Sequence, residues 1–142
     1  MLTLLAETAA DLEKLKFYNE AQPIAKIIHI IGAFMMIIGI SALVMQKQGD
    51  SKKLPMMFHG IGMLVLFIAG IAWLVFASKL GQDYKMSQPW VLTKMIIWLI
   101  FGVSVVLAKK GIIFKGAVGW LAIIVLGGVA VAMAVLKVGA AG

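Results

Sequence analysis

The chain has 142 residues, of which 63% are hydrophobic and only 13% are charged, and its mean hydropathy is +1.05. Soluble domains carry about 25% charged residues, so this composition excludes an ordinary soluble domain and indicates a single all-α integral membrane domain. The net charge of +7 reflects 13 lysines against six acids, with no arginine. We assign these lysines to anchoring at the lipid bilayer and expect no nucleic-acid partner. The absence of cysteine excludes disulfides, thiolate catalysis, thiolate-ligated iron–sulfur clusters and c-type haem attachment.

Residues 1–22 are predicted to form an amphipathic helix ahead of the membrane domain. Four apolar residues recur there at helical spacing: Leu2, Leu5, Ala9 and Leu12. Such a helix either lies in the membrane interface or docks on a partner protein. We expect Pro23 to end it, because the residue before a proline is pushed out of the helical region. The stretch lacks the basic start and long apolar core of a signal peptide, so Met1 is expected to be the mature start.

Four apolar stretches of about 20 residues follow, each long enough to cross the hydrocarbon core. They cover residues 24–45, 55–76, 89–108 and 117–136. Short polar turns separate them, the first centred on Gly49 and Asp50, so successive spans are antiparallel neighbours. The sequence therefore predicts a four-helix transmembrane bundle over residues 23–142.

The distribution of lysines among the loops predicts the orientation. The first and third loops together hold Lys47, Lys52, Lys53, Lys109, Lys110 and Lys115. The opposite side mixes Lys14, Lys16, Lys79 and Lys85 with five acids. Because short cytoplasmic loops are enriched in lysine and arginine, we place the first and third loops in the cytoplasm and both termini outside, in a bacterial inner membrane.

Small residues indicate which helix faces meet. His29, Gly32, Met36 and Gly39 share one face of the first span, and His59, Gly62, Leu66 and Ala69 repeat the pattern on the second. Glycine at a helix contact allows close approach where lipid supplies no hydrophobic drive between helices. We therefore expect both histidines to point toward a helix contact.

His29 is the ionisable residue that most needs an explanation. It is a neutral packing residue, a ligand to haem iron or another metal, or a proton carrier. Lys26, one turn earlier, is interpreted as a headgroup anchor. A single haem between His29 and His59 is disfavoured, because antiparallel helices place the two at depths about 15 Å or more apart.

The third span runs parallel to the first, so its start lies on the same side as His29. Trp90, Lys94 and Trp98 stand there at steps of four, on one helical face. Lys94 is thus the predicted companion of His29, although a lysine at this depth also reaches the headgroups by snorkelling.

Over residues 23–137 the chain resembles the small four-helix SirB membrane family, through the motifs AKIIHIIG, LPMMFHGIGML and WVLTKMIIW. More remotely it is similar to HemJ-type protoporphyrinogen oxidases and CopD-like copper-resistance proteins. The shared elements are Lys-x-x-His, here Lys26 and His29, and Trp-x-x-x-Lys, here Trp90 and Lys94. In HemJ-type enzymes the matching histidine and lysine form the functional pair and haem b is bound, which implies these roles for His29 and Lys94.

The chain also departs from both family patterns. HemJ-type sequences follow the first span with Leu-Pro-Arg and a further histidine, whereas ALVMQKQG stands here and arginine is absent. Arginine's planar fork commonly recognises propionates, so the resemblance does not extend to a porphyrin substrate. Against the SirB pattern, His59 replaces an expected acidic residue.

Two functions from different classes remain, and whether the protein is an enzyme stays open. The first is binding of haem b or a related tetrapyrrole, in a redox or haem-pathway role, with His29 as the metal ligand. The candidate binding residues are His29, Lys94, Trp90, Trp98 and His59. The second is a non-catalytic accessory subunit, packed in a larger membrane complex or a homo-oligomer. Proton-coupled transport is disfavoured, since no acid lies inside any span.

Overall fold

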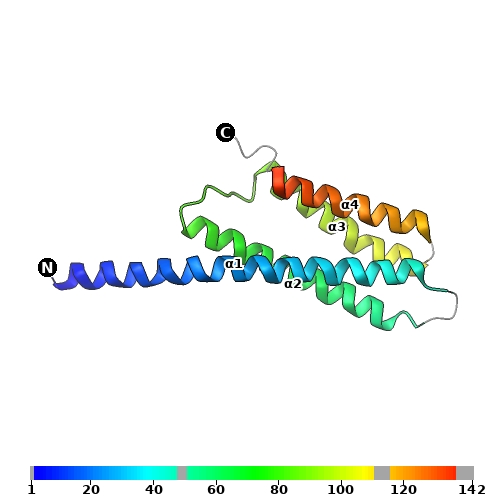
Figure 1. The fold of residues 1–142 in the computed structure, drawn as a ribbon, viewed down its shortest axis with the longest axis horizontal. Helices are drawn as coiled ribbons and strands as arrows, with labels where there is room; N and C mark the ends of the chain where they lie inside the picture. The colour runs from blue at the N-terminus through cyan, green and yellow to red at the C-terminus, as the bar shows by residue number, and fades with distance from the viewer. Residues whose placement is uncertain (1, 48–50, 111–115, 137–142) are drawn as a thin grey trace.

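The computed structural model describes residues 2–47, 51–110 and 116–136, and within them the side chains of residues 9–132. Four helices make up nearly all of this part: α1 (Leu2–Met45), α2 (Lys53–Lys79), α3 (Pro89–Lys110) and α4 (Ala117–Leu136). They run alternately in opposite directions, so that the α1–α2 and α3–α4 connections lie at one end (Figure 1). The predicted all-α class and the four-helix arrangement are confirmed.

The predicted helix boundaries agree with the structure except at Pro23. The end of the first helix and the starts of the third and fourth fall where the sequence places them, and α2 is a few residues longer at each end. The predicted turn at Gly49 and Asp50 and most of the third loop lie outside the described residues.

The expected break at Pro23 is wrong, because α1 continues through it as one helix. Proline in a helix removes one hydrogen bond to the carbonyl four residues earlier, here that of Asn19. Asn19 is exposed, so water can solvate the freed carbonyl and the helix tolerates the proline. Residues 2–22 are therefore the first half of α1 and not a separate helix.

Three helices have the length and composition needed to cross a membrane. They are Ala9–Met45 of α1, Lys53–Lys79 and Pro89–Lys110. The described part of α4, Ala117–Ala132, is apolar but shorter. The structure thus supports a membrane protein built as a helical bundle.

Helices α1 and α2 form the closest pair in the molecule. A Cβ placed on Gly32 would lie 2.5 Å from the backbone nitrogen of Leu66, and one on Gly62 would clash with the backbone nitrogen of Met36. Gly39 likewise faces the backbone of His59. Only glycine permits this approach, so the predicted contact between the two small-residue faces is confirmed.

A small apolar core joins this pair to the other helices. It consists of Met36, Ile40, Val44, Ile97, Phe101 and Ile123. Most large apolar side chains instead point outward along all four helices, among them Ile27, Phe34, Leu64, Ile96 and Val131. The hydrophobic effect in water therefore does not explain why these apolar side chains face outward.

The segment of α1 before Phe17 projects beyond the rest of the bundle (Figure 1). Its last contacts with the other helices are aromatic: Phe17 and Tyr18 pack on Phe76 near the end of α2. Nearby, the side-chain amide of Gln22 donates to that of Gln82 at 3.2 Å. The side chains from Ala9 to Lys16 are exposed.

Candidate functional site

His29 lies half-buried where α1 crosses α2. Its Nδ1 is 2.7 Å from the carbonyl oxygen of Leu66. Because a carbonyl only accepts, Nδ1 carries the proton and donates it. Gly70 makes room for the ring, since a Cβ there would lie 2.9 Å from the imidazole. Nε2 of this half-buried ring makes no hydrogen bond with the described residues.

His59 occupies the equivalent place on α2 and is only 2% exposed. Its Nδ1 donates to the carbonyl oxygen of Met36 at 3.0 Å. Nε2 is buried without a hydrogen-bond partner among the described residues. The backbone of Phe101 on α3 also lies beside this ring, and His59 lies in the α1–α2 contact.

The two histidines form a reciprocal pair of links between α1 and α2. His29 bonds to Leu66, seven residues beyond His59, and His59 bonds to Met36, seven residues beyond His29. The rings therefore lie at different levels, separated by about 10 Å at 1.5 Å per residue. This separation is smaller than the expected 15 Å, yet each ring faces the opposite backbone rather than the other ring, and the two do not ligate one iron.

Lys94 lies within electrostatic range of His29, and no direct contact joins the two side chains among the described residues. The lysine interacts electrostatically with His29 and with Lys26. Its ammonium also stands 5.0 Å above the ring of Trp90, a cation–π contact. These residues bring three cationic or cation-forming groups to one end of the bundle, with no described carboxylate paired to them.

Trp90 and Trp98 take separate places, although the sequence puts them on one face. Trp90 is buried against Trp73 and Tyr84 in an aromatic cluster. Trp98 donates its indole N–H to the carbonyl of Met63 at 3.2 Å and stacks on Phe67. Their separation of eight residues exceeds two turns of an ideal helix by about 80°, which explains the divergence.

Sequence reasoning missed Trp73, Tyr84, Phe67 and Gly70. The aromatic residues carry no motif, and only the packing shows that they hold α2, α3 and the intervening loop together. Gly70 directly follows Ala69 of the predicted small-residue face, and this position is the feature of the sequence that could have indicated its role.

A haem ligand normally donates one ring N–H to a carbonyl and offers the other nitrogen to iron. His29 has this donor arrangement. Two grooves in the described part of the chain, of about 380 and 470 Å³, are lined by residues other than His29. No group of three or more potential metal-binding side chains occurs among the described residues. The ligand chemistry therefore fits haem at His29, whereas a preformed haem cavity is not seen there.

Comparison of the chain with protein-family models, with curated proteins and with solved structures finds no match. The class of protein is accordingly defined by the fold itself: a helical bundle with at least three helices able to cross a membrane.

Proposed function

We propose that this chain is an integral membrane protein whose four helices all span the bilayer, and that it serves as a non-catalytic accessory subunit of a larger membrane complex. The outward-facing apolar side chains along every helix support the first part, because lipid tails cover such surfaces. The lysines of the first and third loops support a cytoplasmic position for these loops. Both termini then lie outside, in a bacterial inner membrane.

The single observation that supports the accessory role is the projecting N-terminal segment of α1. A helix of 44 residues is about 66 Å long, whereas the hydrocarbon core is about 30 Å thick. Figure 1 shows α1 as one continuous helix whose N-terminal segment extends past the end of α2, and we infer that this segment stands clear of the bilayer rather than lying along it. Leu12 and Leu15 are adjacent on this segment and are 67% and 45% exposed.

Other surfaces are less suited to docking. The small-residue faces of α1 and α2, which the sequence offers for contact with other subunits, are used within the chain. The histidines on these faces bond to backbone carbonyls, as structural residues do. The leucines of the projecting segment remain as the apolar surface outside the membrane that requires a protein partner.

Site-specific photo-crosslinking in cells tests this role. A crosslinking amino acid at Leu12 should yield one discrete adduct with another membrane subunit, and one at Lys14, on a different face, should not. Leu12→Glu with Leu15→Glu should shift the protein to a smaller complex on a native gel while leaving its level in the membrane unchanged. A wild-type protein that migrates as a monomer and forms no adduct would contradict the proposal, and adducts between two copies would indicate a homo-oligomer.

Haem b binding at His29 is the second candidate, favoured by the Nδ1–H bond to Leu66, which leaves Nε2 for a metal. Lys94 is then the nearby cation for a propionate. Protein purified from haem-replete cells should show a Soret band that His29→Ala removes. Lys26→Gln, a change one turn away on an exposed residue, is the matched control and should leave the band intact. A colourless wild-type preparation would exclude this candidate.

A further inference from the structure

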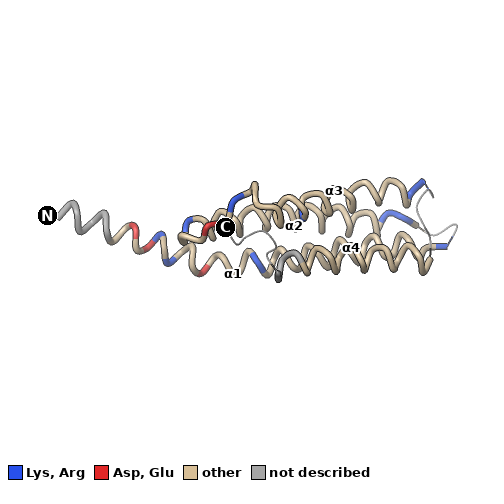
Figure 2. The backbone as a smooth tube through the Cα atoms, turned by 90° about the horizontal axis from the view of Figure 1, so that it is seen from above, with Lys and Arg blue, Asp and Glu red and all other residues tan. Residues whose placement is uncertain are grey.

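Lysines from two distant parts of the sequence meet at the end of the bundle that carries the α1–α2 and α3–α4 connections. The ammonium of Lys52 lies 3.5 Å from the carbonyl oxygen of Lys109, which places the start of α2 beside the end of α3. Lys53 and Lys110 are the exposed neighbours of this pair. Figure 2 shows the lysines gathered there. Asp50, in the same loop by sequence, lies outside the described residues.

An apolar groove of about 470 Å³ runs between α3 and α4. Its α3 wall extends from Ile96 to Leu107, and its α4 wall from Gly119 to Leu126. Ser104 is the polar side chain in this lining, and its hydroxyl donates to the carbonyl of Phe101 at 2.8 Å. The lining of the groove is therefore apolar along its length.

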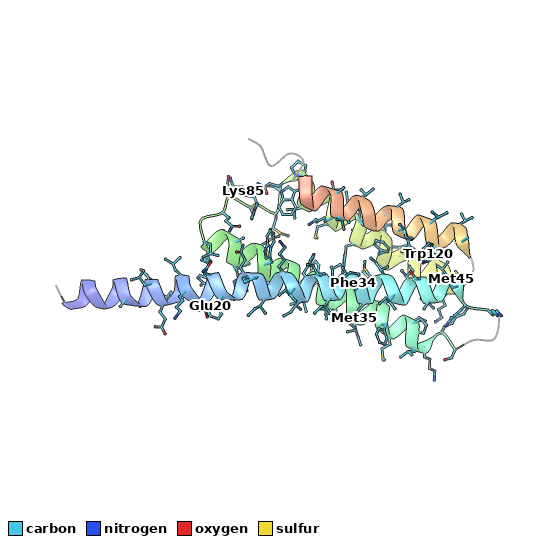
Figure 3. The ribbon with its side chains drawn as sticks, in the orientation of Figure 1. Glu20, Phe34, Met35, Met45, Lys85 and Trp120 are labelled. Atoms are coloured by element: carbon cyan, nitrogen blue, oxygen red, sulfur yellow. The ribbon has the colours of Figure 1, made fainter. Side chains whose placement is uncertain are left out.

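The groove leads to the lysines. Leu107 precedes Lys109 and Lys110 by less than one helical turn. Gly119 lies in the first turn of α4, at the same end of the bundle. The backbone N–H of Gly116 donates to the carbonyl of Val44 at 3.3 Å, which holds the start of α4 against the end of α1. Trp120 and Met45 accordingly lie at the same end in Figure 3, opposite Glu20 and Lys85.

We propose that this end of the bundle binds one anionic phospholipid, with an acyl chain in the α3–α4 groove and its phosphate among the lysines of α2 and α3. This inference rests on the proposed membrane location and not on the accessory role. From Ile96 to Leu107 the groove rises about 17 Å, close to half the thickness of the hydrocarbon core. One leaflet's acyl chain therefore matches its length.

Charge selects the headgroup. A phosphate with no compensating amine is attracted by a lysine cluster beside the membrane, whereas a zwitterionic headgroup brings a cation that the lysines repel. At the other end of the bundle, Lys85 pairs with Asp83 at 3.2 Å. The cluster of Lys52, Lys53, Lys109 and Lys110 has no such partner among the described residues.

Native mass spectrometry of the full-length protein tests the site. The protein is reconstituted in an equal mixture of phosphatidylglycerol and phosphatidylcholine with the same acyl chains, and the retained lipid is identified. One phosphatidylglycerol should remain bound in preference to phosphatidylcholine, and excess inorganic phosphate should not displace it. Lys109→Gln with Lys110→Gln should reduce the preference about tenfold or more. Lys79→Gln with Lys85→Gln, at the opposite end, is the matched control and should leave it unchanged.

A second pair of variants tests the groove. Ala122→Trp, which fills it, should remove retained lipid, and Ala132→Trp, outside the groove lining, should not. Equal retention of the two lipids by the wild type, or an equal loss in both lysine variants, would overturn the proposal. Because the lysines are exposed, their variants remain informative if the tryptophan variant fails to fold. Release of the wild-type protein from membranes by alkaline carbonate would instead overturn the membrane location itself.

Discussion

The imidazole of His29 donates its Nδ1–H to the carbonyl oxygen of Leu66 at 2.7 Å, and His59 makes the matching bond in the opposite direction to Met36. These bonds lie on either side of the closest backbone approach, where Gly32 faces Gly62. The histidines and glycines therefore act together to fix the register of α1 against α2.

Substitution of the contact glycines should separate α1 from α2. Gly32→Val and Gly62→Val both place side-chain atoms against backbone that has no freedom to yield, and each should lower the free energy of unfolding by at least about 1–3 kcal/mol. Reversible unfolding in mixed micelles measures the change. Gly60→Ala is the control, since a Cβ there meets nothing within 4 Å. Equal stability of all three variants would refute this packing.

Truncation of His59 should be more damaging than truncation of His29. His59 is almost fully buried, so His59→Ala leaves a cavity in addition to a lost hydrogen bond, at a cost of about 2–5 kcal/mol. His29 is half-buried, and His29→Ala should cost mainly its hydrogen bond, about 0.6 kcal/mol for a typical bond in a membrane protein. The same unfolding experiment compares them. A larger loss of stability for His29→Ala than for His59→Ala would contradict this prediction.

Trp98→Phe should isolate the indole hydrogen bond to Met63. The phenyl ring retains the stack on Phe67 but has no N–H for the carbonyl, so we expect a loss of about 0.5–1.5 kcal/mol. Trp120→Phe, on the exposed face of α4, should change stability little. Equal stability of the two variants would mean that the hydrogen bond from the indole to the Met63 carbonyl does not contribute to stability.

Lys94→Met should leave the stability unchanged or raise it. The cation–π contact with Trp90 contributes about 0.5–1 kcal/mol, while removal of a half-buried ammonium relieves its desolvation and its repulsion from Lys26. The thermal midpoint in detergent provides the measurement, with Lys26→Met as the exposed comparison. A loss above about 2 kcal/mol would assign Lys94 a structural role that exceeds this contact.

Pro23→Ala should strengthen α1. Alanine restores the N–H that bonds to the Asn19 carbonyl, and proline inside a helix costs about 3 kcal/mol relative to alanine. Hydrogen–deuterium exchange across residues 19–27 should slow in the variant. Faster or unchanged exchange would indicate that the helix is already interrupted at this point.

The length of the apolar stretches and the polar turns between them were sufficient to predict the number of helices and most of their ends. Pro23 was misjudged because a local rule about proline ignores whether the freed carbonyl reaches water, as the exposed Asn19 does. Whether residues 2–22 continue into the rest of α1 therefore depended on the exposure of Asn19, which the sequence does not specify.

Part of the site followed from chain direction and residue size. Parallel first and third spans predicted that Lys94 lies near His29, and the glycine spacing predicted the α1–α2 contact. Helix rotation and rotamers decided the rest. They direct Trp98 to Met63 on α2 and Trp90 to Trp73 and Tyr84, and no spacing rule distinguishes these outcomes.

The reciprocal histidine links make α1 and α2 halves of a local two-fold arrangement, in which each contact residue recurs thirty positions later: His29 with His59, Gly32 with Gly62, and Met36 with Leu66. The paired glycines, Gly32 and Gly62, both face the backbone of the other helix, whereas His29 and His59 differ in burial. A saturation mutagenesis map of the chain should therefore show two equally deep minima of tolerance, thirty residues apart, at these two glycines.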